Sequence, residues 1–201
     1  TIHIPIALAC LIGPLLQIKP ENLMLLPLHI VLLELIMNPT CSTVLERQPA
    51  DIGIMEGGPR STNTKLFNKV NMLKSILQGI TIFIGSFGLY YLFLHFDSEN
   101  IALARTAGLS VLIISNIFLI VVNSSETERA YKSAKRLMKD RGIIIIGIIT
   151  VLLLVLLLYS PISKLLMLTP LSGIQMFFVI LTAFVSVFWY EVVKLLKYSK
   201  R

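Results

Sequence analysis

The stretch LLELIMNPTCSTV, residues 32–44, places three groups that are costly in hydrocarbon inside an apolar run. Glu34 brings a carboxylate, Asn38 brings an amide, and Pro39 lacks a backbone N–H. Because Pro39 cannot donate to the carbonyl of Leu35, we expect a helix that is interrupted at Asn38-Pro39. An ionisable side chain at the centre of a bilayer costs about 2.5 kcal/mol or more and marks a functional site by default. The alternative is a paired or protonated Glu34 beside a simple proline kink.

The composition around this stretch is that of a membrane protein. Of the 201 residues, 55% are hydrophobic and only 14% are charged, and the mean hydropathy is +0.81. A water-soluble domain has about 25% charged residues, so a soluble enzyme is excluded. We therefore predict an all-α, polytopic membrane protein.

Spanning a bilayer takes about 20 apolar residues per helix, and six segments of the chain are candidates. They are residues 2–18, 23–45, 70–96, 101–122, 142–159 and 173–196. We expect a bundle of six transmembrane helices that forms a single transmembrane domain over residues 1–201. The chain opens at Thr1 directly in an apolar stretch without a charged leader, which indicates a fragment of a longer protein.

The positive charges collect on one side of this predicted topology. The net charge is +7, and most Lys and Arg residues fall in 46–74, in 123–141 and in the tail that begins at Lys194. The other side holds only Lys19, Arg105 and Lys164. By the positive-inside rule the basic side is cytoplasmic, so both termini are expected inside, in a bacterial plasma membrane. The charge thus reports topology, and we expect the lipid bilayer, not nucleic acid, as a partner.

The polar groups of the opening stretch suggest a cation site. Glu34 and Asn38 are four residues apart and share a helix face, and the freed carbonyl of Leu35 lies beside them. Hard cations prefer such oxygen donors, and transporters use broken helices at the bilayer midplane to supply them. Asn116, in SVLIISNIFLIVVN (110–123), is either a further oxygen donor that faces Glu34 or an interhelical hydrogen-bonding group. The three histidines have no ligand spacing in the sequence.

Three stretches carry a family resemblance. They are LLPLHIVLLELIMNPTCSTVLERQPAD (25–51), PADIGIMEGGPR (49–60) and ARTAGLSVLIISNIF (104–118). With the order of the segments, they resemble the C-terminal membrane domain of P-type cation-transporting ATPases of the calcium-pump type. The resemblance covers the whole chain, and the six segments would match transmembrane helices 5 to 10 of that family.

The resemblance implies roles for individual residues. The family's helix 6 supplies ion ligands as Asn, two residues, Thr, then Asp; here Glu34 stands at the Asn, Met37 at the Thr and Asn38 at the Asp. Asn116 stands where calcium pumps can carry a Glu in helix 8. Helix 5 often adds an acid, but HIPIALACLIGPLL (3–16) has none. Fewer carboxylates imply one cation per cycle, with Ca²⁺, Mn²⁺, Mg²⁺ and a proton-coupled variant all open.

The resemblance places the ATP chemistry elsewhere. The family's phosphorylated Asp lies in a D-K-T-G-T motif upstream, and this sequence contains none. ATP and Mg²⁺ would bind only in those upstream domains, which would be partners of this chain, and the chain alone would not be catalytic. The alternatives are an independent six-helix channel, a secondary carrier or a regulatory subunit. The first two would be expected to show internal repeats, which the sequence does not.

Overall fold

The computed structural model describes residues 1–47, 69–96, 100–125 and 130–198, so the stretch PADIGIMEGGPR (49–60) lies outside the described residues. Every regular element in these ranges is helical, which confirms the all-α prediction. The elements are α1 (His3–Leu15), the 3₁₀ turn η1 (Pro20–Asn22), α2 (Pro27–Glu46), α3 (Lys69–Phe96), α4 (Ile101–Asn123), α5 (Ala130–Leu137), α6 (Arg141–Tyr159), α7 (Ile162–Leu165) and α8 (Gly173–Tyr198).

Of the six predicted spanning segments, five form long apolar helices and the first forms a shorter apolar helix, consistent with a helical membrane bundle. Among the described residues, α2, α3, α4, α6 and α8 are long and apolar enough to cross a membrane, judged by length and composition. The predicted segment 2–18 is helical only as α1, which has 13 residues.

The predicted interruption at Asn38-Pro39 is wrong, because α2 stays α-helical from Pro27 to Glu46 with Pro39 inside it. Pro39 removes one N–H from the helix, but neighbouring threonines add side-chain hydrogen bonds to nearby carbonyls. Thr40 Oγ1 donates to Ile36 O at 2.6 Å, and Thr43 Oγ1 donates to Pro39 O at 2.8 Å. These bonds reinforce the helix on both sides of Pro39, although neither reaches the carbonyl of Leu35, to which Pro39 cannot donate.

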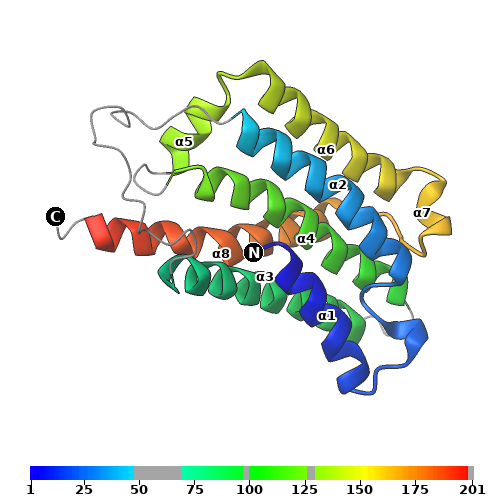
Figure 1. Ribbon diagram of the computed structural model, residues 1–201. Helices are drawn as coiled ribbons and strands as arrows, with labels where there is room; N and C mark the ends of the chain where they lie inside the picture. The colour runs from blue at the N-terminus through cyan, green and yellow to red at the C-terminus, as the bar shows by residue number, and fades with distance from the viewer. Residues whose placement is uncertain (48–68, 97–99, 126–129, 199–201) are drawn as a thin grey trace.

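Helix α4 is the centre of the bundle. It lies between α2 and α6 on one side and α3 and α8 on the other (Figure 1). Every residue from Leu103 to Asn116 is buried. An unpaired polar group is costly in such an interior, and Arg105 and Asn116 of α4 bond to neighbouring segments, whereas Ser110 Oγ and Ser115 Oγ have no hydrogen-bond partner among the described residues.

At one end of the bundle, Arg105 of α4 connects three segments. It is 2% exposed. Its Nε donates to Leu23 O at 3.0 Å, Nη1 to Met167 O at 3.3 Å and Nη2 to Glu21 O at 2.8 Å. His29 of α2 adds a parallel link, with Nε2 2.7 Å from Leu166 O. The guanidinium therefore joins the turn before α2 to the segment after α7.

We predict that Arg105→Lys destabilises the protein. A lysine ammonium cannot replace the guanidinium fork at three carbonyls, and hydrogen bonds to charged groups are worth about 1.5–3 kcal/mol each. We expect the free energy of unfolding to fall by roughly 2 kcal/mol or more. Thermal unfolding of the detergent-solubilised protein measures this, with the exposed Lys19→Ala as the control. An unchanged melting temperature for Arg105→Lys would contradict the role given to this side chain.

Candidate cation site

Glu34 and Asn38 meet on one face of α2, as their spacing predicts. Asn38 Nδ2 donates to Glu34 Oε2 at 2.7 Å. The side chain of Glu34 is 35% exposed, and Asn38 and Pro39 are exposed beside it. Met37, by contrast, is buried in the apolar core. The polar face of α2 is therefore accessible, while the opposite face packs into the bundle.

His3 is a third member of this site that the sequence reasoning missed. Its Nδ1 lies 2.9 Å from Glu34 Oε1, so both carboxylate oxygens of Glu34 have a partner within the chain. The chain folds back at the turn around η1, so α1 and α2 run in antiparallel senses and the start of α1 lies toward the middle of α2 (Figure 1). The spacing of the histidines in the sequence could not reveal this pair. The short connection between the first two apolar segments could have, because it predicts that these segments pack side by side as a hairpin.

Asn116 does not contact Glu34 or Asn38 in any described hydrogen bond. Its Oδ1 accepts a hydrogen bond from Cys41 Sγ at 3.3 Å, and Cys41 lies seven residues beyond Glu34 on the same face of α2. Asn116 is 1% exposed, and its Nδ2 has no hydrogen-bond partner among the described residues. A cavity of about 190 Å³ lies against Asn116 and Cys41. Asn116 thus links α4 to α2 and retains unused hydrogen-bonding capacity.

The structure brings together fewer ligand atoms than a complete cation site needs. They are the carboxylate of Glu34, the amide of Asn38 and the imidazole of His3, next to the carbonyl of Leu35, whose usual helical donor Pro39 cannot supply. Within the described part of the chain, no three His, Cys, Asp or Glu side chains come together as a metal site. Since Ca²⁺ takes six to eight oxygen ligands, these groups can form only part of its shell.

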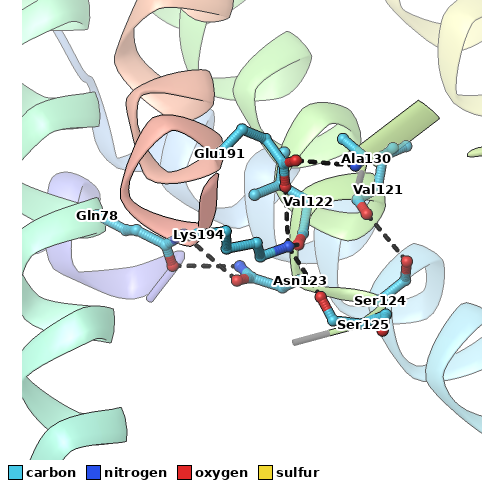
Figure 2. A network of polar contacts seen from close by, with 9 residues as sticks. All are labelled: Gln78, Val121, Val122, Asn123, Ser124, Ser125, Ala130, Glu191 and Lys194. Atoms are coloured by element: carbon cyan, nitrogen blue, oxygen red, sulfur yellow. Dashed lines mark hydrogen bonds and ion pairs between the residues drawn. The ribbon is translucent and has the colours of Figure 1, made fainter. Parts of the chain in front are cut away.

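A second carboxylate, Glu191 of α8, is neutralised internally. Its Oε1 lies 2.8 Å from Lys194 Nζ, and its Oε2 accepts a hydrogen bond from Ala130 N, at the start of α5 (Figure 2). Lys194 is 6% exposed and also donates to Val122 O at 2.5 Å and to Ser125 O at 2.8 Å. The buried ammonium interacts favourably with the carbonyl end of α4 and neutralises Glu191, which leaves this carboxylate no net charge to offer a cation.

Beside this pair, Gln78 of α3 and Asn123 of α4 exchange two hydrogen bonds, at 3.3 and 3.2 Å (Figure 2). Sequence reasoning counted Lys194 only as a topology-setting charge of the tail. The structure shows that it joins α8 to the end of α4 and, through Glu191, to α5. This polar cluster is therefore part of the scaffold, and of Glu191 and Glu34 it is Glu34 that has an accessible face.

The last turn of α2 is attached to α6 by an ion pair. Arg47 Nε lies 3.0 Å from Asp140 Oδ1, and the same carboxylate caps α6 by accepting from Gly142 N and Ile143 N. The hydrogen bond from Arg47 is the largest cause that holds the pKa of Asp140 below its usual value, and the backbone hydrogen bonds of the cap act in the same direction.

We predict that Asp140→Asn reduces the loss of stability in acid. Because the pKa of Asp140 is lower in the folded protein, its stabilisation is complete above its ordinary pKa of about 4 and disappears as the pH falls through the lowered value. Asparagine can still cap α6 but cannot be titrated. Melting temperatures between pH 7 and pH 3 should therefore decline less in Asp140→Asn than in the wild type, with Glu21→Gln as the control. Parallel curves for wild type and Asp140→Asn would refute this linkage.

The comparison with known proteins agrees with this architecture. The family model described as "Cation transporting ATPase, C-terminus" matches residues 22–196, which include α2 with its Glu34 and Asn38 and all the helices that follow. No curated protein matches the chain. Because the match covers most of the chain, the protein belongs to the family that forms the C-terminal transmembrane part of cation-transporting ATPases.

Proposed function

We propose that this chain forms part of the cation path of an ATP-driven pump, with Glu34 as its charged ligand and Asn38 as a second ligand. The observation that carries the proposal is the accessible carboxylate–amide pair on a helix long enough to span the membrane. A carboxylate in this position costs free energy in a bilayer, and a transported cation would offset that cost.

Binding a cation at Glu34 requires its present partners to change. One oxygen is occupied by Asn38 and the other by His3, at 2.7 and 2.9 Å. Rotation of the Asn38 amide would present its oxygen in place of its NH₂ group, and His3 can offer a nitrogen lone pair when neutral. The existing hydrogen bonds thus hold the three side chains close to positions from which they can act as ligands.

The donor set favours one divalent cation, and manganese over calcium. There is one carboxylate in the cluster, so it balances less charge than a site with several acids. An imidazole nitrogen is a poor ligand for the hard Ca²⁺ ion, whereas Mn²⁺ accepts oxygen donors and binds nitrogen more readily. The remaining ligands would come from helices of the pump that precede this chain, and Asn116 is a further candidate through its unused amide capacity.

The ATP chemistry would take place in other domains of the pump. The chain has no D-K-T-G-T motif, so we propose that it supplies the transport half of the cycle. Alternating access would then be driven by phosphorylation of an aspartate outside residues 1–201. Cation binding at Glu34 would be required before this phosphorylation can occur.

We predict that Glu34→Gln abolishes cation-dependent formation of the phosphoenzyme in the intact pump. The substitution keeps the size of the side chain but removes the charge, and we expect the apparent cation affinity to fall by at least about a hundredfold, as loss of even an outer-shell partner costs 10- to 100-fold. Phosphorylation by radiolabelled ATP at increasing Mn²⁺ or Ca²⁺ is the measurement. The matched control is Glu46→Gln, an exposed acid on the same helix. Unchanged affinity in Glu34→Gln would refute the assignment.

We predict that His3→Ala changes the choice of cation. Removing the imidazole should weaken Mn²⁺ activation by about tenfold or more and affect Ca²⁺ activation less, because nitrogen contributes little to calcium binding. The same phosphorylation assay measures both ions, with His95→Ala on α3 as the control. Equal losses for both ions would show that His3 only orients Glu34.

A further inference from the structure

A deep apolar groove runs along α6 on the side that faces α2, α4 and α5. Its cavity has a volume of about 580 Å³, within the range of about 300–1,000 Å³ that is typical of small-molecule sites. Thr40 and Val44 of α2, Ile120 of α4 and Leu137 of α5 contribute to its walls. Thr40 Oγ1 is itself occupied by Ile36 O, which leaves a lining with little hydrogen-bonding capacity.

The length of the groove matches one leaflet of a bilayer. On α6 its lining extends from Ile143 to Val155, which at 1.5 Å per residue is about 18 Å. Half of a hydrocarbon core of roughly 30 Å is about 15 Å. A spanning partner helix would need contacts along the full thickness, so the dimensions favour an acyl chain.

The end of the groove next to α5 is strongly basic. Residues 130–141 carry five cationic side chains and a single carboxylate, Asp140, and that carboxylate is already paired with Arg47. Ala134 and Met138 line the groove. Lys135 and the exposed Tyr131 belong to the same helical stripe, at spacings of three, four and seven residues. An aromatic and a lysine at this level are typical of the headgroup region.

From these observations we propose that an anionic phospholipid binds in this groove, with one acyl chain along α6 and its phosphate at the exposed Lys135 of α5. The groove provides the apolar site for the chain, and the excess of positive charge selects an anionic headgroup over a zwitterionic one. The proposal concerns a site distinct from Glu34 and does not depend on the cation that the pump carries.

Gly147 allows a direct test, because it lines the groove and a Cβ at this position would meet no atom within 4 Å. Gly147→Leu should fill the space of the acyl chain without a clash. Gly88→Leu on α3 is the matched control, since a Cβ at Gly88 also meets nothing within 4 Å but Gly88 lies outside the groove. Should the leucine variant not fold, Gly147→Ala places one methyl group in the same space and should give a smaller effect in the same direction.

The measurement is native mass spectrometry of the delipidated, intact protein titrated with palmitoyl-oleoyl phosphatidylglycerol or with phosphatidylcholine of the same chains. We expect the wild type to bind phosphatidylglycerol more tightly than phosphatidylcholine. Gly147→Leu should weaken phosphatidylglycerol binding by at least about tenfold, since each CH₂ excluded from an apolar site costs about 0.8 kcal/mol, and Gly88→Leu should bind as the wild type does.

The headgroup is tested by Lys135→Gln, with the exposed Lys164→Gln on α7 as the matched control. Near a membrane surface one lysine is worth about 1 kcal/mol toward anionic lipid, so we expect about a fivefold loss for phosphatidylglycerol and none for phosphatidylcholine. Equal binding of both lipids by the wild type, or undiminished binding by Gly147→Leu, would overturn the proposal. A dimer that is lost in Gly147→Leu would also overturn it, because a second copy would then occupy the groove.

Discussion

The arrangement of the bundle depends on the burial of α4. Every residue of α4 from Leu103 to Asn116 is buried, and the helix carries Arg105, Thr106, Asn116 and, at its half-buried end, Asn123. Each of these side chains contacts a different part of the chain: Arg105 the turn before α2, Thr106 the N–H of Thr169, Asn116 helix α2, and Asn123 helix α3. The cost of an unpaired polar group in a low-dielectric interior makes these contacts selective for one arrangement.

The same contacts explain why α2 can carry a functional site. One end of α2 is held by His29 against Leu166 O and the other by Arg47 against Asp140. Between these ends the helix presents Glu34, whose hydrogen-bond partners among the described residues are the side chains of Asn38 and His3. Fixed ends and an accessible, polar middle are what a transport site requires, because the ligands must exchange a cation while the scaffold stays in place.

Hydropathy alone was sufficient to predict a helical membrane bundle, because long apolar runs have no other stable form in lipid. It failed where local rules compete with tertiary contacts. Pro39 predicted a break, but the loss of a single N–H did not end α2. His3 was set aside because its partner, Glu34, is distant in the sequence. Lys194 was assigned to the surface, yet the carbonyl end of α4 provides a buried position for its charge. The predicted ligand role of Asn116 stays a prediction, since its observed partner is Cys41.

The two carboxylates therefore have different roles in this account. Glu191 is neutralised by Lys194 and belongs to the scaffold, whereas Glu34 has an accessible face and belongs to the proposed site. Equilibrium binding of radioactive Mn²⁺ and Ca²⁺ to the intact, purified pump in the absence of ATP tests this claim most directly. We expect one saturable site that prefers Mn²⁺, is lost in Glu34→Gln and is retained in Glu191→Gln if that variant folds, or otherwise in Glu46→Gln. Binding that persists unchanged in Glu34→Gln would contradict the account, because the cation would then bind without this carboxylate.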